Sequence, residues 1–121
     1  MLCLTWGMRT EPGGFQSLWA FDVDNHAAFT EAAAGALTVL SELPGFAEGH
    51  VLHNVDEHPR YVVATRWVDV GSFRRALSSP RAKLEVWPFL AAMRDEPSAF
   101  ETLVYAIPGT VEAFPSSATG A

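Results

Sequence analysis

Two histidines three residues apart, His50 and His53, are the first candidates for chemistry in this chain. Their spacing resembles that of a metal-ligand pair, but the apolar residues around them and Gly49 favour a strand. Residues three apart on a strand point to opposite faces, so the two side chains cannot chelate one metal ion. Either imidazole could instead line a pocket as a general base, since it exchanges protons near neutral pH. A histidine at the surface or at an interface is the alternative.

Glu85 and Asn54 are the other polar residues that could take part in catalysis. A Glu85 carboxyl buried against Trp67 could act as a base, because burial disfavours its charged form, whereas an exposed Glu85 would be an ordinary surface acid. Asn54 follows His53 near a strand end, where turn chemistry before Asp56 is the alternative. We take His53, Glu85 and Asn54 as candidate catalytic residues, and no spacing in the chain indicates a metal site.

Two tryptophans are candidates for contact with a substrate. Trp67 closes the β-branched, aromatic-rich segment that starts at Arg60, where it could form a pocket wall or be part of the core. Trp87 precedes Pro88, which should kink or break a helix at that point. Trp87 could therefore belong to an apolar lid, although ordinary core packing explains it equally well.

Six elements must position these side chains. The segment from His26 to Leu43 follows the helical period, is rich in alanine and ends at Pro44-Gly45, which predicts a helix with Phe29 on its inner face. A second helical region covers 72–77 and restarts at Pro80, with Ser79 as its cap. Four segments rich in β-branched and aromatic residues predict strands: 14–23, 46–55, 60–69 and 99–107.

The order of these elements is strand, helix, strand, strand, helix, strand. This is the ferredoxin-like α+β pattern, a four-stranded antiparallel sheet with the helices on one face. The domain is expected over residues 16–107. Residues 1–15 are expected to be a leader, and residues 108–121 a flexible tail.

The third strand has apolar side chains on both faces, so both faces should be covered. One face carries Tyr61, Val63, Thr65 and Trp67, and the other carries Val62, Ala64, Arg66 and Val68. Helices can cover only one of them, so the other predicts a homodimer. Arg66 would lie on that second face, where an ion pair with Glu101 or Asp22 is expected.

The composition limits the partners. Fourteen acidic and eight basic residues give a net charge of −6, which argues against nucleic acid or an anionic membrane as the partner. No segment approaches the roughly 20 apolar residues that span a bilayer. A soluble, cytoplasmic, single-domain protein is the default expectation, and one cysteine excludes an internal disulfide.

Several motifs together resemble the antibiotic biosynthesis monooxygenase family. They are PGF before the second strand, Trp67 at the end of the third, SFRRALSSP in the following helix and DEPSAFETL before the last strand, and the resemblance spans about Gln16 to Ala106. It implies a dimeric α+β barrel with a pocket between sheet and helices. It also implies a hydrophobic small-molecule substrate and no cofactor, since the best-understood members oxidise phenolic polyketide anthrones with molecular oxygen alone.

The positions of this family map onto the chain with substitutions. The pocket Trp of the family matches Trp67. The anthrone oxidisers carry an Asn where this chain has Val63, a Tyr where it has Phe73, and an Arg at or near Trp87. Members that degrade haem carry a His shortly after the Trp, and residues 73–77 contain none, so haem degradation is not expected. The substrate-binding candidates are Trp67, Phe73, Trp87, Val63 and Phe29.

The favoured function is therefore cofactor-independent oxygenation of a hydrophobic aromatic or polyketide-type molecule in secondary metabolism. Three family polar groups are replaced by apolar ones, and this keeps two alternatives open. One is a non-oxidative cyclase or isomerase of a polyketide-type intermediate, with a His or Glu as acid or base. The other is a non-catalytic protein that binds a small molecule.

Overall fold

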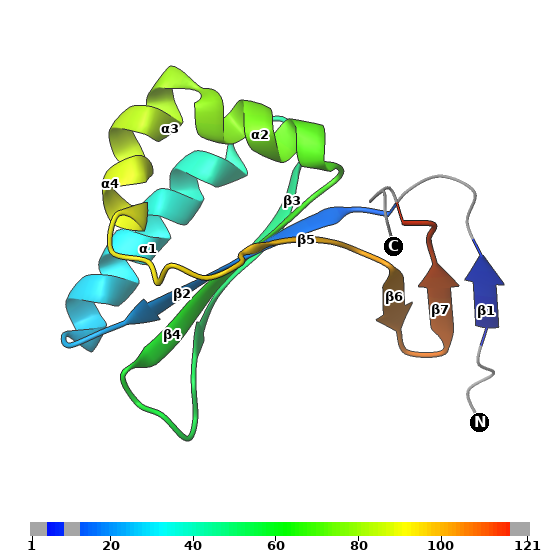
Figure 1. The fold of residues 1–121 in the computed structure, drawn as a ribbon, viewed down its shortest axis with the longest axis horizontal. Coiled ribbons are helices and arrows are strands. Elements are labelled where there is room, and N and C mark those ends of the chain that lie inside the picture. The colour runs from blue at the N-terminus through cyan, green and yellow to red at the C-terminus, as the bar shows by residue number, and fades with distance from the viewer. Residues whose placement is uncertain (1–4, 9–12, 117–121) are drawn as a thin grey trace.

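A four-stranded antiparallel sheet with helices on one face forms the body of the protein (Figure 1). The computed structural model describes residues 5–8 and 13–116. The sheet consists of β2 (Phe15–Asp22), β3 (Phe46–His53), β4 (Arg60–Trp67) and β5 (Ala99–Glu101), in the order β3-β4-β2-β5. This order, with β2 and β4 in the centre, confirms the predicted ferredoxin-like fold.

Local sequence signals set the ends of the helices. Helix α1 (His26–Ser41) begins after Asn25, whose side chain accepts a hydrogen bond from the Ala28 amide. Helix α2 (Val70–Ser78) is capped in the same way by Asp69, and α3 (Pro80–Glu85) by Ser79. A separate short helix, α4 (Trp87–Leu90), contains Pro88 at its first turn. The predicted break near Trp87 is thus present between α3 and α4.

The core lies between the helices and the inner face of the sheet. Tyr61, Val63, Thr65 and Trp67 are all buried on this face, whereas the intervening residues of β4 are only partly buried. The apolar side of β2, including Trp19 and Phe21, lies beside them. Period-two alternation in β2 and β4 therefore directs the largest aromatic side chains towards the helices.

A second, three-stranded sheet stands apart from the helices beyond the end of the main sheet (Figure 1). It has the order β1-β7-β6 and consists of β1 (Thr5–Met8), β6 (Val104–Ile107) and β7 (Thr110–Ala113). The prediction of one strand over 99–107 was therefore wrong, because β5 and β6 belong to different sheets.

The division of that segment follows from where β2 begins. Phe15 pairs with Glu101, and the Thr102 amide donates to the Gly14 carbonyl, so β2 offers no further strand partner. The Leu103 carbonyl instead accepts from Phe114. A Cβ atom at Gly13 would collide with the Thr102 carbonyl, so glycine permits this close crossing of the two segments.

The tail expected to be flexible from residue 108 contains β7, and the expected leader contains β1. Pro108 and Gly109 form the two-residue connection between β6 and β7, with Gly109 at φ +81°. Proline followed by a glycine with positive φ is the preference of a type II turn. The Pro-Gly pair therefore indicates a hairpin, and the prediction of a flexible tail over residues 108–121 did not take it into account.

Candidate functional site

Three polar groups form a hydrogen-bonded chain inside the core. The Trp67 indole donates to the Thr65 hydroxyl at 2.8 Å, and the Thr65 and Ser17 hydroxyls are hydrogen-bonded to each other. Trp67, Thr65 and Ser17 are all fully buried. They meet because β2 and β4 pair with Ser17 opposite Thr65, both facing the helices.

A count of hydrogens shows what this chain can still bind. The two hydroxyls carry two hydrogens, and only one of these is used between Ser17 and Thr65, whichever residue donates. The Trp67 indole supplies its own hydrogen. No other acceptor for the second hydroxyl hydrogen is present among the described residues. The hydrogen-bonded groups of Ser17, Thr65 and Trp67 can therefore donate one further hydrogen bond, to a bound oxygen atom.

Phe73 is the central residue of the aromatic surroundings of this chain. From α2 its half-buried ring contacts Phe15, Trp19 and Trp67, with centroid distances of 4.5, 6.2 and 5.9 Å. Phe46 packs edge-on against Trp67 at 5.2 Å. Aromatic side chains thus pack around the indole, and they help to shield the polar chain from water.

The candidates Val63 and Phe29 belong to the same interior but have different neighbours. Val63 is fully buried on β4 between Tyr61 and Thr65 in sequence. Phe29 of α1 packs against Phe21, Tyr61 and Phe89, with ring centroids 5.0, 5.1 and 5.6 Å away. Val63 therefore lies on the same inner sheet face as Thr65, whereas Phe29 is part of the aromatic cluster near Tyr61.

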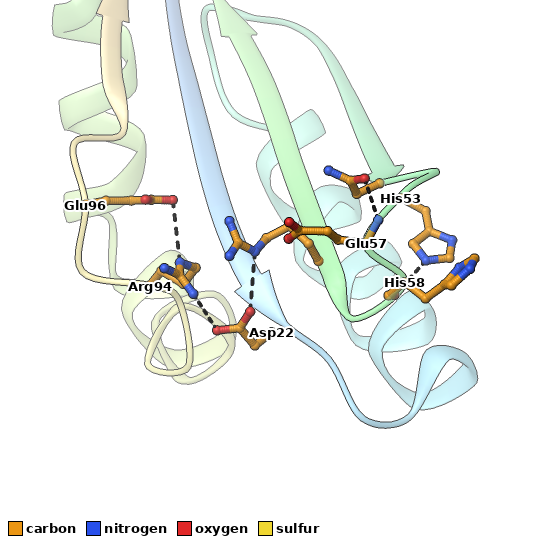
Figure 2. A network of polar contacts seen from close by, with 8 residues as sticks. Asp22, His53, Glu57, His58, Arg94 and Glu96 are labelled. Carbon is orange, nitrogen blue, oxygen red and sulfur yellow. Dashed lines mark hydrogen bonds and ion pairs between the residues drawn. The ribbon is translucent and has the colours of Figure 1, made fainter.

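His53 lies in a separate open hollow beside the β3–β4 hairpin. The hollow has a volume of about 330 Å³, and its walls include His26, His58, Tyr61 and Asp24. The His53 Nε2 group donates to the His58 carbonyl oxygen at 2.7 Å (Figure 2). Its ring stacks on Tyr61 with a centroid distance of 4.2 Å and an interplanar angle of 8°.

His50 and His53 do lie on opposite faces of the sheet. His50 pairs opposite Ala64 on the outer face, 3.8 Å from Glu48, and His53 pairs opposite Tyr61 on the inner face. In the part of the chain that the structure describes, no group of three or more His, Cys, Asp or Glu side chains is arranged to hold a metal ion.

Asn54 shapes the hairpin next to His53. Its side-chain oxygen accepts hydrogen bonds from the amides of Asp56 and Glu57, both at 2.8 Å. This is the turn role given above as the alternative to catalysis, and it uses the carboxamide oxygen that a substrate would need.

Glu85 is exposed and does not meet the condition for a buried base. Its carboxylate lies 2.9 Å from Arg81, which also binds Glu42. The two carboxylates raise the pKa of Arg81, with the hydrogen bond to Glu42 as the largest cause. This arrangement joins α3 to the end of α1 on the surface, away from the buried indole of Trp67.

Trp87 forms part of a second, apolar hollow of about 340 Å³ between α2 and α4. The side chain is 50% exposed, and its indole donates to the Leu77 carbonyl at 2.9 Å. Leu77 and Leu90 line this hollow and also pack against the core. Trp87 is thus anchored at the mouth of an apolar hollow in the helical layer.

The catalytic candidate His53 and the substrate-binding candidates Trp67 and Phe73 therefore lie in different places, whereas Phe29 packs against Tyr61 next to His53. Tyr61, next to His53, and Trp67 are six residues apart on β4, or about 20 Å at strand rise. Four residues of these sites were not singled out from the sequence as site residues: Ser17, Thr65, His26 and Tyr61. Ser17 and Thr65 share strand parity with Trp19 and Trp67, and this shared parity was the available signal.

Charged groups lie at the rim of the sheet. Arg66 pairs with Glu48 at 3.2 Å, not with the expected Asp22, and its guanidinium lies 5.6 Å from the Tyr105 ring centroid. The hydrogen bond from Arg66 is the main cause of the lowered pKa of Glu48. Asp22 instead binds Arg94 at 2.8 Å and Arg60 at 3.3 Å (Figure 2).

Comparisons with known proteins agree with the fold and the resemblance. The chain is 26% identical to SnoaB, a cofactor-independent oxygenase from Streptomyces nogalater, with a TM-score of 0.63 over 73% of this chain and 91% of that one. A conserved protein from Methanosarcina mazei (14% identity, TM-score 0.59, coverage 74% and 90%) and a protein from Shewanella oneidensis (11%, 0.60, 76% and 93%) share the fold.

No curated protein sequence matches the chain. A sequence model of the antibiotic biosynthesis monooxygenase family matches residues 19–84, which include α1, β3, β4, α2, half of β2 and most of α3. The matched segment covers more than half of the chain and contains Trp67 and Thr65. The chain therefore belongs to the antibiotic biosynthesis monooxygenase family.

Proposed function

We propose that the protein is a cofactor-independent monooxygenase that acts on a hydrophobic aromatic molecule of polyketide type. The observation that carries this proposal is the buried Ser17–Thr65–Trp67 chain, which retains one donor hydrogen inside an aromatic interior. Family membership and the likeness to a cofactor-independent oxygenase support the same reaction class.

The chemistry follows from the groups that this interior contains. An electron-rich substrate anion can reduce oxygen itself, with one oxygen atom entering the substrate and the other leaving as water. The anion gains stability from a hydrogen bond in a site without water. Among the described residues, the buried polar side chains are those of Ser17, Thr65 and Ser72, and all three end in hydroxyls. The site therefore donates hydrogen bonds and does not accept the substrate proton. We therefore expect the substrate to enter in its ionised form.

Substrate entry requires movement of Phe73. Its ring occupies the space next to Phe15, Trp19 and Trp67, where a planar substrate would stack. Phe73 is half-buried on the short helix α2, so a rotation of its side chain would open the interior from the helical side. The apolar hollow at Trp87 would receive the hydrophobic part of the molecule.

The test is oxygen uptake with a panel of anthrones and hydroquinones. Thr65→Val keeps the shape of the side chain and removes the hydroxyl, so we expect a fall of about tenfold or more in the uptake rate. Ser17→Ala should have a smaller effect, because the Trp67–Thr65 hydrogen bond remains. The uptake rate above the spontaneous reaction is measured with an oxygen electrode.

Thr38→Val is the matched control for this test. Among the described residues, the Thr38 hydroxyl bonds only to the Ala34 carbonyl of its own helix, so the same chemical change is made at an exposed position outside the buried polar chain. Thermal unfolding of each variant shows whether the fold is intact. Equal oxygen uptake by the wild type and a folded Thr65→Val variant would contradict the proposed role of the buried chain.

We further propose that the outer face of the four-stranded sheet binds a second copy of the chain. Leu18, Leu52 and Phe100 are 37%, 49% and 44% exposed on this face. The charged pairs Arg66–Glu48 and Arg60–Asp22 lie at the two ends of this apolar centre. An apolar centre with a charged rim is typical of a protein interface.

A further inference from the structure

The hollow beside the β3–β4 hairpin contains groups that the proposed oxygenase reaction does not use. This hollow brings together the rings of His26, His53 and Tyr61. The ring centroids of His26 and Tyr61 are 5.6 Å apart, and those of His26 and His53 are 5.9 Å apart. About 20 Å of strand separates this group from Trp67.

The hydrogen bond of His53 determines its tautomer. The His58 carbonyl oxygen can only accept, so Nε2 of His53 carries the hydrogen of that bond (Figure 2). In the neutral ring, Nδ1 is then the unprotonated nitrogen, with a free lone pair. No described residue donates to that nitrogen. This is the state that a general base requires.

Stacking on Tyr61 holds the His53 ring in a fixed orientation. The two rings are nearly parallel, 8° apart, with centroids at 4.2 Å. The stack and the hydrogen bond to the His58 carbonyl together fix the direction in which Nδ1 of His53 points.

Tyr61 supplies a hydrogen-bond donor in the same hollow. Its hydroxyl oxygen is hydrogen-bonded to Nδ1 of His26, and the residue is almost completely buried. When His26 carries its hydrogen on Nδ1, it donates to the Tyr61 oxygen. The Tyr61 hydrogen is then available to an acceptor in the hollow, and His26 acts as a positioning residue.

We infer that this hollow is a second catalytic site, which exchanges a proton on a small enolisable carbonyl compound without oxygen. His53 Nδ1 takes the proton from the α-carbon, and the electron pair of the broken C–H bond forms the enolate. The enolate oxygen accepts a hydrogen bond from Tyr61. The proton then returns from His53 to carbon, so the step needs no oxidant or other reactant. A volume of about 330 Å³ suits a small substrate.

The test is deuterium exchange into 2-tetralone, a small enolisable ketone, in D₂O under argon. Loss of the α-proton signal is followed by NMR, and the buffer rate is subtracted. We expect His53→Gln to lower the exchange rate at least tenfold, because the amide can still donate to the His58 carbonyl but offers no base. His50→Gln is the matched control, since the same change is then made on the opposite face of β3.

Separate variants test the positioning role of His26. Tyr61→Phe should lower exchange severalfold. His26→Leu should lower it to the same level, and His26→Asn should restore most of it, because an amide N–H can replace the Nδ1–H. The double variant His26→Leu/Tyr61→Phe should be no slower than Tyr61→Phe alone. Additive losses would contradict this role.

Equal exchange rates for the wild type, His53→Gln and His50→Gln would overturn the inference. The interior site is tested separately, because Thr65→Val should leave 2-tetralone exchange unchanged while lowering oxygen uptake. Failure of one proposal therefore does not imply failure of the other.

Discussion

Asp22 shows how a single exposed residue connects distant parts of the chain. Its carboxylate binds Arg94, which follows α4, and Arg60, at the start of β4 (Figure 2). The hydrogen bond from Arg94 is the largest cause of the lowered pKa of Asp22, and both arginines add to it through their charge. The two ion pairs hold the segment after the helices against the sheet, where Arg94 also donates its amide to the Ala20 carbonyl.

This ion pair predicts a pH dependence of stability. Because the folded-state pKa of Asp22 lies below its unfolded value of 3.8, its contribution is fully present above that value and is lost as the pH falls through the folded pKa. We expect Asp22→Asn to lower the free energy of unfolding at pH 6 and to lower it by less at pH 3, below the unfolded value. Urea unfolding at both pH values measures this. Asp95→Asn is the control, and a pH-independent loss for Asp22→Asn would argue against the charge effect.

At the scale of elements, the cap of α2 determines how Phe73 is presented to the core. Asp69 accepts a hydrogen bond from the Ser72 amide at 2.7 Å, and this bond is the main cause of its lowered pKa. The amide of the next residue in the helix, Phe73, donates a hydrogen bond to the Asp69 carbonyl. The first turn of the helix thus aligns the ring that covers the buried polar chain.

Loss of this cap should destabilise the protein. We expect Asp69→Ala to lower the free energy of unfolding by about 1 kcal/mol. Asp69→Asn should lower it much less, because asparagine is an equally good cap. Urea unfolding at pH 7 distinguishes the two variants. Equal losses for alanine and asparagine would show that the charge of Asp69, and not the hydrogen bond to the helix, is what matters.

At the scale of the whole molecule, no other described residues cover the outer sheet face or the exposed strand β6 of the three-stranded sheet. All of β6 is exposed, including Val104, Tyr105 and Ile107. Figure 1 shows that the small sheet projects beyond the body, which makes it accessible to a second copy. In the described residues, no helix is long and apolar enough to cross a membrane.

The proposed homodimer predicts a change of mass with one substitution. Leu18→Glu places a charge in the apolar centre of the outer face, so the variant should be a monomer where the wild type is a dimer. Light scattering coupled to size-exclusion chromatography measures the mass. Leu84→Glu, at a 77%-exposed leucine on α3, is the control and should remain dimeric. A monomeric wild type would refute the dimer.

Much of the fold could be predicted from the sequence because its signals are local. The alternation in β2 and β4, the cap Ser79 and the break before Pro88 each depend on a few neighbouring residues. Where the prediction failed, the cause was non-local. The strand over 99–107 divides because β2 starts at Phe15. This depends on the pairing of Phe15 with Glu101, 86 residues further along the chain.

The sequence by itself determined the family, the ferredoxin-like order of elements and which side chains face the core, because periodicity and motif order are properties of the chain. Only the tertiary structure decided which polar groups meet. Strand register brings Ser17 to Thr65 and His53 to Tyr61, while the hairpin turn uses the side-chain oxygen of Asn54. A hydrogen bond forms only when two segments are placed relative to each other to within a fraction of an ångström, and no local sequence pattern fixes that placement.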